Sequence, residues 1–235
     1  MKKRLHLREE RGHSDFGWLD SWHSFSFGHW FHPKKMGFGK LRVLNDDTVA
    51  PESGFGTHPH ENMEIISIPI EGKISHKDSS GGKGTIEPGE IQVMSAGTGI
   101  THSEYNLSKN ERLKFLQIWI LPKKMNVKPR YEQRLFLKDD FKNRIRTVVF
   151  PESHSDELNI CQDAYISIGD MEETQEIIYK NYSGENGVFL FVISGQAEID
   201  GQTLREKDAV ELTEENSYSV RAEKNSKLLF IEVPL

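Results

Sequence analysis

The sequence reads Gly54-Phe-Gly-Thr-His58-Pro-His60-Glu-Asn-Met-Glu64 at the point that decides its fold. About forty residues later it reads Gly97-Thr-Gly-Ile-Thr-His102-Ser-Glu104-Tyr-Asn-Leu. In an extended strand successive side chains alternate faces, so residues two apart point the same way. Each stretch can therefore present two ligand groups on one side. Three imidazoles and one carboxylate suit a first-row divalent ion that keeps open positions for substrate or oxygen.

Composition limits the class of protein. The chain has 235 residues, enough for one large all-β domain or two of ordinary size. The N-terminus lacks an apolar stretch after its charges, and the longest apolar run, Val188 to Ile193, is too short to cross a bilayer. A single cysteine, Cys161, excludes an internal disulfide framework, and we expect it to be buried. We therefore expect a cytoplasmic protein with no membrane partner.

Charge is distributed unevenly along the chain. The net charge is −6, and residues 140–235 carry −10, which leaves +4 on residues 1–139. Neither part is strongly basic, and the sequence has no long segment rich in lysine and arginine. We therefore predict no nucleic-acid partner.

Short β-rich runs alternate with glycine and proline turns throughout the chain. Such a pattern is typical of an all-β sandwich or barrel. The runs in the first part are residues 42–49, 63–70, 73–78, 90–94 and 113–121. We predict an N-terminal domain over residues 1–125, a linker over 126–139 and a C-terminal domain over 140–235.

The second domain repeats the pattern of the first. Ile66–Ile74 can be aligned with Phe189–Ala197, which matches Gly72 to Gly195. This alignment puts three residues without imidazole or carboxylate groups where the first half has His58, His60 and Glu64; they are Asn181, Ser183 and Gly187. We therefore predict that the second barrel kept the fold but lacks the metal ligands.

Aromatic residues are concentrated between positions 14 and 32. We expect most of them to pack against the core, while some line a pocket for a flat ligand. The candidates for the pocket are Phe25 and Phe27 from this region and Phe55 from the first histidine segment. Three histidines in the same region lack paired spacing, and we expect hydrogen-bonded structural roles for His23, His29 and His32.

These motifs resemble a known superfamily. The first cupin motif corresponds to His58, His60, Glu64 and Gly72, and the second to Gly99, His102 and Asn106. Longer segments of the sequence resemble the pirin family more specifically. The resemblance is dense over residues 12–131, and in the rest of the chain it rests on architecture alone. These segments are Trp18-Leu-Asp-Ser, Phe25-Ser-Phe-Gly, Gly37-Phe-Gly-Lys-Leu-Arg-Val, Gly54-Phe-Gly-Thr-His-Pro-His and Met94-Ser-Ala-Gly-Thr-Gly-Ile.

The resemblance implies a bicupin, two tandem jelly-roll-like β-barrels with one metal site in the first. It implies the ligands His58, His60, His102 and Glu104. Typical cupins use the carboxylate that corresponds to Glu64, so Glu64 is expected beside the metal or as a substitute ligand. The ligand set accepts Fe, Ni, Cu, Mn or Zn, and the family implies Fe(II).

The resemblance also implies two kinds of function. One is a dioxygenase of the quercetin 2,3-dioxygenase type, which opens the central ring of a flavonol with O2. Glu104 would then be ligand and general base together, and the partners would be a small aromatic substrate and O2. The alternative is a non-enzymatic regulator whose metal and redox state control binding of a protein partner. The acidic second half offers a surface for a basic partner.

Overall fold

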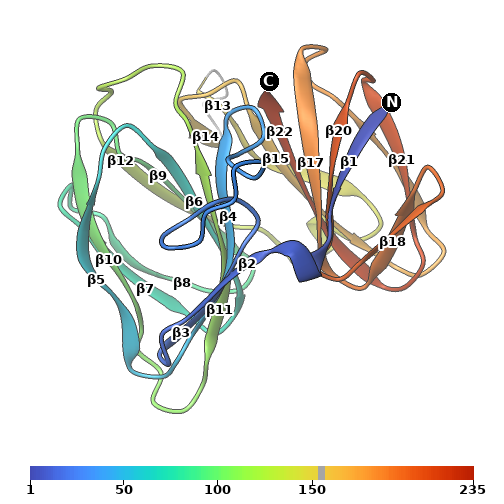
Figure 1. The fold of residues 1–235 in the computed structure, drawn as a ribbon. Coiled ribbons are helices and arrows are strands. Elements are labelled where there is room, and N and C mark those ends of the chain that lie inside the picture. The colour runs from blue at the N-terminus through green and yellow to red at the C-terminus, as the bar shows by residue number, and fades with distance from the viewer. Residues whose placement is uncertain (153–156) are drawn as a thin grey trace.

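A computed structural model describes residues 1–152 and 157–235 of the chain. Within these ranges the strands form four sheets. Figure 1 shows two barrel-shaped halves side by side, and each half combines a larger and a smaller sheet. The described part of the chain contains no helix with the length and apolar character of a membrane span. The predicted all-β architecture of two tandem barrels is confirmed.

The first barrel contains the predicted ligand segments. Its seven-stranded sheet has the spatial order β12 (Arg130–Leu135), β9 (Glu90–Ser95), β6 (Glu64–Glu71), β11 (Leu113–Ile120), β4 (Leu41–Val49), β3 (Leu19–His23) and β2 (Gly12–Asp15). Its four-stranded sheet has the order β5 (Ser53–His60), β10 (Ile100–Asn106), β7 (Ile74–Asp78) and β8 (Lys83–Ile86). Burial alternates strictly along β10 at its even positions, as expected for a strand with one face toward the interior.

The second barrel repeats this arrangement. Its larger sheet has the order β1 (Lys2–His6), β20 (Ala209–Thr213), β17 (Asn186–Ser194), β22 (Ser226–Pro234), β15 (Tyr165–Met171), β13 (Ile145–Pro151) and β14 (Leu158–Ile160). Its smaller sheet has the order β16 (Glu176–Lys180), β21 (Ser217–Ala222), β18 (Gln196–Ile199) and β19 (Gln202–Arg205). Two short 3-10 helices complete the described elements, η1 (Arg8–Glu10) and η2 (Lys138–Asp140).

The repeat predicted from the sequence is visible in the two larger sheets. β9, β6, β11 and β4 are neighbours in the first, and β20, β17, β22 and β15 are neighbours in the second. β6 and β17 therefore take equivalent places, as the alignment of their sequences predicted.

The two larger sheets share an apolar layer between the barrels. Its buried residues come from both halves and include Leu44, Ile66, Ile118, Ile166, Phe189, Phe191 and Leu229. Central strands therefore bury one face against this layer and the other inside their own barrel. This explains why β17 reads as a continuous apolar run instead of an alternating one.

The interiors of the two barrels differ. In the second, one continuous cluster fills the space, with Val188, Leu190, Val210 and Phe230 among its members. In the first, two smaller clusters form around Phe115 and around Met94. Buried polar side chains occupy the same interior and form the candidate site described below.

Strand pairing crosses the predicted domain boundaries. β1 lies in the range assigned to the first domain, but it pairs with β20 of the second barrel. β12 lies in the predicted linker, but it pairs with β9 of the first barrel. Near the other terminus, the Lys40 amide donates to the Pro234 carbonyl at 3.0 Å. The chain thus ties the barrels together at both ends (Figure 1), and the boundaries 1–125, 126–139 and 140–235 stay a prediction.

Candidate metal centre

Three imidazoles meet on the inner face of the smaller sheet of the first barrel. β5 and β10 pair with His102 opposite His58 and Ile100 opposite His60. The ring centroids of His58, His60 and His102 are 4.4 to 4.9 Å apart. One nitrogen from each ring lies within 4.8 Å of the others. The structure therefore brings together the three predicted imidazole ligands.

The hydrogen bonds and burial of the three rings leave ring nitrogens available to bind a metal. His58 Nδ1 donates to the Gly56 carbonyl at 2.8 Å, which leaves Nε2 as the free ligand atom. Among the described residues, neither ring nitrogen of buried His102 has a hydrogen-bond partner. Buried polar atoms are normally paired, so these nitrogens fit an ion. Burial and the neighbouring His58 imidazole lower the pKa of His60 to about 4, so its ring is neutral at neutral pH.

Glu104 is the carboxylate of this interior. Ser67 Oγ donates to Oε1 at 3.2 Å and Gln117 Nε2 donates to Oε2 at 2.8 Å, so the carboxylate is held from the opposite sheet. Burial raises the pKa of Glu104, and its hydrogen bonds oppose that rise. Its ligand oxygen lies within 4.8 Å of nitrogens of His76 and His102. Glu104 thus borders the imidazole cluster at His102.

His76 on β7 is a member of this interior that the sequence analysis missed. Its Nε2 contacts Asp78 Oδ2 at 2.9 Å, and its ring stacks on Tyr131 with centroids 4.6 Å apart. The His76 and His102 centroids are 5.3 Å apart. A signal was present, because His76 and Asp78 repeat the two-residue spacing of the ligand pairs.

Glu64 lies on the opposite side of β6, and its expected place beside the metal is wrong. Ser95 Oγ donates to Glu64 Oε2 at 2.6 Å, and the backbone of Cys161 also forms a hydrogen bond with the Glu64 carboxyl group. Ser67, three residues along β6, faces Glu104 instead. Strand alternation puts residues 64 and 67 on opposite faces. Cys161 is buried, as expected.

A pocket of about 400 Å³ opens beside the imidazoles and is mainly apolar in its lining. Its walls include the rings of Phe16, Trp18, Phe27, Phe55 and Trp119, together with His58, His60 and Glu104. Flat rings on several sides suit a flat ligand. Phe27 and Phe55 line the pocket as expected. Phe25 does not, because it is buried between the barrels, where its ring centroid lies 5.3 Å from that of Phe189.

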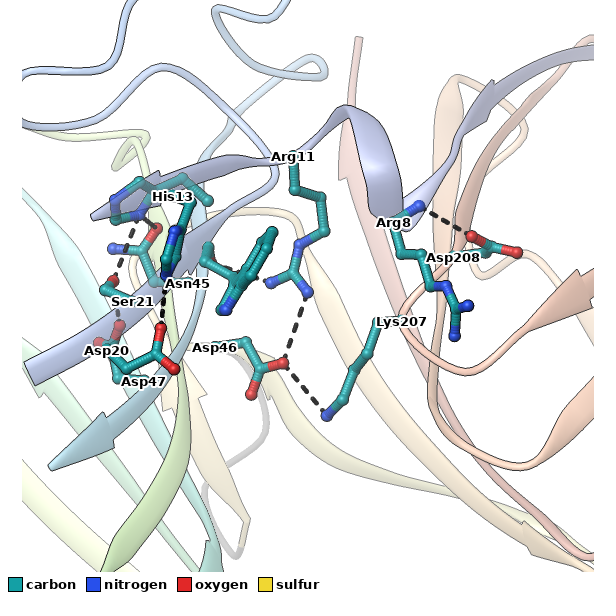
Figure 2. Close-up of polar contacts among 12 residues, drawn as sticks. Arg8, Arg11, His13, Asp20, Ser21, Asn45, Asp46, Asp47, Lys207 and Asp208 are labelled. Carbon is teal, nitrogen blue, oxygen red and sulfur yellow. Dashed lines mark hydrogen bonds and ion pairs between the residues drawn. The ribbon is translucent and has the colours of Figure 1, made fainter. Parts of the chain in front are cut away.

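The pocket also has a polar wall on β3 and β4. His23 Nδ1 contacts Asn45 Oδ1 at 2.9 Å, which agrees with the structural role expected for this histidine. Ser21 Oγ donates to Asp47 (Figure 2). Burial raises the pKa of Asp47 to about 7. This wall can therefore offer both donors and acceptors to a ligand.

The second barrel has no equivalent cluster among the described residues, since both groups of potential ligands lie in the first. Asn181 and Ser183 stand where the repeat matched His58 and His60. The Ser183 amide donates to buried Glu232 at 3.0 Å, and Asn181 Nδ2 donates to the Asn186 carbonyl at 3.2 Å. These contacts are structural.

Comparison with known proteins agrees with this geometry. Residues 4–120 match the pirin family, and residues 147–233 match the quercetinase C-terminal cupin domain. A quercetin 2,3-dioxygenase from Escherichia coli K12 is 40% identical over 98% of this chain and 99% of its own length. The chain belongs to the pirin family.

Solved pirin structures confirm the bicupin fold. YhhW from Escherichia coli superposes with a TM-score of 0.94 and 39% identity, covering 99% of this chain and 98% of that chain. The bacterial pirin YhhW in complex with nickel(II) gives a TM-score of 0.93 at 39% identity, with 99% of each chain covered.

Gly54 allows β5 to approach β10 in this pirin barrel. A Cβ on Gly54 would lie 2.3 Å from the Glu104 carbonyl oxygen and 2.6 Å from Tyr105 Cα. We expect Gly54→Ala to push β5 outward, to lower the free energy of unfolding by about 1–3 kcal/mol and to weaken metal binding. Gly56→Ala is the matched control, because its Cβ would meet only the Tyr105 hydroxyl at 3.7 Å. Denaturant unfolding and metal titration of both variants test this; equal behaviour would contradict it.

Proposed function

We propose that the chain is a metal-dependent dioxygenase that opens the central ring of a flavonol-like aromatic with O2, as the name of its Escherichia coli relative indicates for that protein. The observation that supports this most is the convergence of three imidazoles next to an aromatic-lined pocket, whose wall includes His58, His60 and the buried carboxylate of Glu104. A pocket of about 400 Å³ is of the size that small ligands occupy.

We assign the metal to His58, His60, His102 and Glu104. The orphaned nitrogens of His102 support this assignment, and one divalent transition metal fits the donor set. Fe(II) is the metal we expect from the family, and the nickel complex of YhhW supports a divalent ion. Such an ion, when bound, supplies Lewis acidity that makes a coordinated hydroxyl group easier to deprotonate.

We assign to Glu104 the role of accepting the proton of the substrate hydroxyl group. Burial raises the pKa of this carboxylate, which makes it a stronger base than an exposed carboxylate. Gln117 and Ser67 keep each oxygen in place. Gln117 is itself oriented by Trp119, whose Nε1 donates to Gln117 Oε1 at 3.3 Å. These contacts hold the base at the wall of the pocket.

The aromatic walls orient the substrate and exclude water. Trp119 and His60 have centroids 4.9 Å apart at 83°, and Trp119 and Phe27 have centroids 5.3 Å apart at 81°. Trp18 and Phe55 meet edge to face at 5.2 Å on another side. A flat polycyclic ligand can lie among these rings with its hydroxyl group toward the imidazoles.

We expect metal-loaded protein to bleach the absorbance band of quercetin with matched O2 uptake. Glu104→Gln keeps the size of the side chain but cannot accept the proton, so kcat should fall by about 100-fold or more. Glu111→Gln, an exposed acid outside the pocket, is the control. Spectrophotometry and an oxygen electrode provide the two readouts.

Full activity in Glu104→Gln would refute the proposed base. Absence of turnover with any of the candidate metals would refute the enzyme assignment. If partner capture then followed the oxidation state of the metal, the regulatory hypothesis would be favoured instead.

A further inference from the structure

A second cavity lies between the two barrels, on the far side of β4 from the ring-lined pocket. This interbarrel cleft has a volume of about 580 Å³, which is in the range of small-molecule sites. Both barrels line it, the first with residues of η1, β3, β4 and β11 and the second with residues around β17, β20 and β22. Asp46 and Asp47 are neighbours on β4, but Asp46 lines the cleft and Asp47 lines the pocket. The two cavities are therefore separate sites.

Cations from both barrels converge on the floor of the cleft. Arg11 Nη1 and Lys207 Nζ lie 3.4 Å and 3.2 Å from the same oxygen, Asp46 Oδ2 (Figure 2). The same two cations lie over the ring of Phe191, at 5.5 Å and 6.0 Å from its centroid. One carboxylate thus faces two positive charges that come from different halves of the molecule.

The backbone holds these cations in place. Buried Asp208 accepts from the Arg8 amide at 2.8 Å through Oδ1 (Figure 2). It also accepts from the Arg205 amide at 2.9 Å through Oδ2, which joins η1 to the turn before β20. Lys207 in that turn has a φ of 71°, in the left-handed region that side chains rarely adopt. Such conformations persist where the surroundings enforce them, often at ligand sites. The cleft floor is therefore preorganised.

A third cation, Lys227 on β22, also lines the cleft. No carboxylate of the described residues lies within 4.0 Å of its Nζ, in contrast to Lys207. Burial lowers the pKa of Lys227, and Asp170, its cross-strand partner on β15, opposes this shift without reversing it, so the ammonium still lacks a full counter-charge. An anion in the cleft would supply that charge.

The acidic residues of the cleft do not cancel this field. The lining carries five basic and five acidic side chains. Three of the acids are at the rim, 48 to 60% exposed, and each contacts a basic side chain of its own; they are Glu9, Asp20 and Glu71. On the floor, Arg11 is 4% exposed and Asp46 14%. Glu206, the fifth acid, is exposed as well. Charges act more strongly where water is excluded, so Arg11, Lys207 and Lys227 outweigh Asp46, which is the one acid of the lining away from the rim.

Apolar surface adjoins these cations. Trp22, Ile70 and Ile193 line the cleft, and the Trp22 ring is held by stacking on His13 with centroids 4.2 Å apart. A ligand that satisfies the lining therefore needs both a negative group and a flat apolar body.

We propose that the interbarrel cleft binds a small aromatic carboxylate, with its charged end at Lys207 and Lys227 and its ring against Trp22, Ile70 and Ile193. Arg11 completes the positive floor. This site is independent of the metal centre and of the reaction proposed for it.

Titration calorimetry of metal-loaded protein with 2-naphthoate tests the site. We expect saturable binding with one ligand per chain, weakened about tenfold or more in Lys207→Gln and in Lys227→Met, since each removes a charge-assisted contact. Lys2→Met, an exposed lysine of the same barrel, should bind as the wild type does. Thermal unfolding of each variant shows whether the fold is kept.

Three outcomes would overturn the proposal. The first is no binding to the wild type. The second is binding that disappears in the double variant His58→Ala, His60→Ala but persists in Lys227→Met, since it would place the carboxylate at the metal centre. The third is equal binding of neutral 2-naphthylmethanol, which would remove the role of the cations. Binding that survives the loss of both histidines and falls with either lysine supports the cleft.

Discussion

Replacing His102 with alanine is expected to leave the purified protein without stoichiometric metal and to lower kcat/KM by about 100-fold or more. His102 has the most buried ring of the three, and its two nitrogens have no hydrogen-bond partner among the described residues. It also lies between the two groups of potential ligands, since it belongs to both. Its loss removes the imidazole that links His58 and His60 to Glu104. Metal analysis and steady-state kinetics measure the effect.

The fold should survive this change. An alanine at position 102 keeps the β10 backbone and removes an imidazole that makes no hydrogen bond. His32→Ala, which removes an exposed histidine, is the matched control and should keep its metal and activity. Metal at one ion per chain in His102→Ala would show that the site does not depend on this ligand.

Replacing Glu232 with alanine is expected to lower the free energy of unfolding by about 3–5 kcal/mol. Glu232 on β22 is fully buried, and its carboxylate accepts from the Tyr179 hydroxyl at 2.9 Å and from the Asn186 amide group at 3.0 Å. The backbone amides of Tyr182 and Ser183 donate to it as well, each at 3.0 Å. The alanine leaves these donors without an acceptor inside the second barrel. Denaturant unfolding measures the loss.

Two further variants separate the causes. Glu232→Gln keeps the volume but places an amide N–H₂ group among donors, so we expect an intermediate loss of stability. Glu185→Ala, an exposed acid on the loop before β17, should change stability by less than about 0.5 kcal/mol. Metal content should stay unchanged in all three, because Glu232 lies in the other barrel. A loss in Glu232→Ala no larger than in Glu185→Ala would show that the network does not stabilise the barrel.

The sequence shows the ligand pairs because strand geometry is local. Side chains two apart share a face whatever the rest of the chain does, so His58 with His60 and His102 with Glu104 could be paired without a structure. The repeat can also be read from the sequence, since the segment of each barrel contains the same order of strands and turns. From these two features the all-β double barrel was correctly predicted. The structure also brings His58, His60 and His102 together, and their role as metal ligands stays a prediction.

Other contacts depend on which strands become neighbours, and the sequence does not state this. The pairing of β1 with β20 and of β12 with β9 joins segments far apart in the chain. His76 enters the interior only because β7 pairs with β10. Phe25 was a candidate for the pocket, yet the packing of the two larger sheets buries it between the barrels.

The carboxylate shows this division most clearly. By itself the sequence established that Glu64 follows the pair of His58 and His60 and that Glu104 lies two residues after His102. Alternation alone could not choose between the two carboxylates. In the tertiary structure β6 belongs to the larger sheet and turns Glu64 toward Ser95 and Cys161, while β10 turns Glu104 toward His102. This arrangement supports Glu104, whose role as a metal ligand stays a prediction. The interbarrel cleft likewise exists only in the folded chain, since Arg11 and Lys207 come from opposite barrels. The order of residues determines which side chains share a face of one strand. A site shared by several strands forms only when the sheets bring those side chains together.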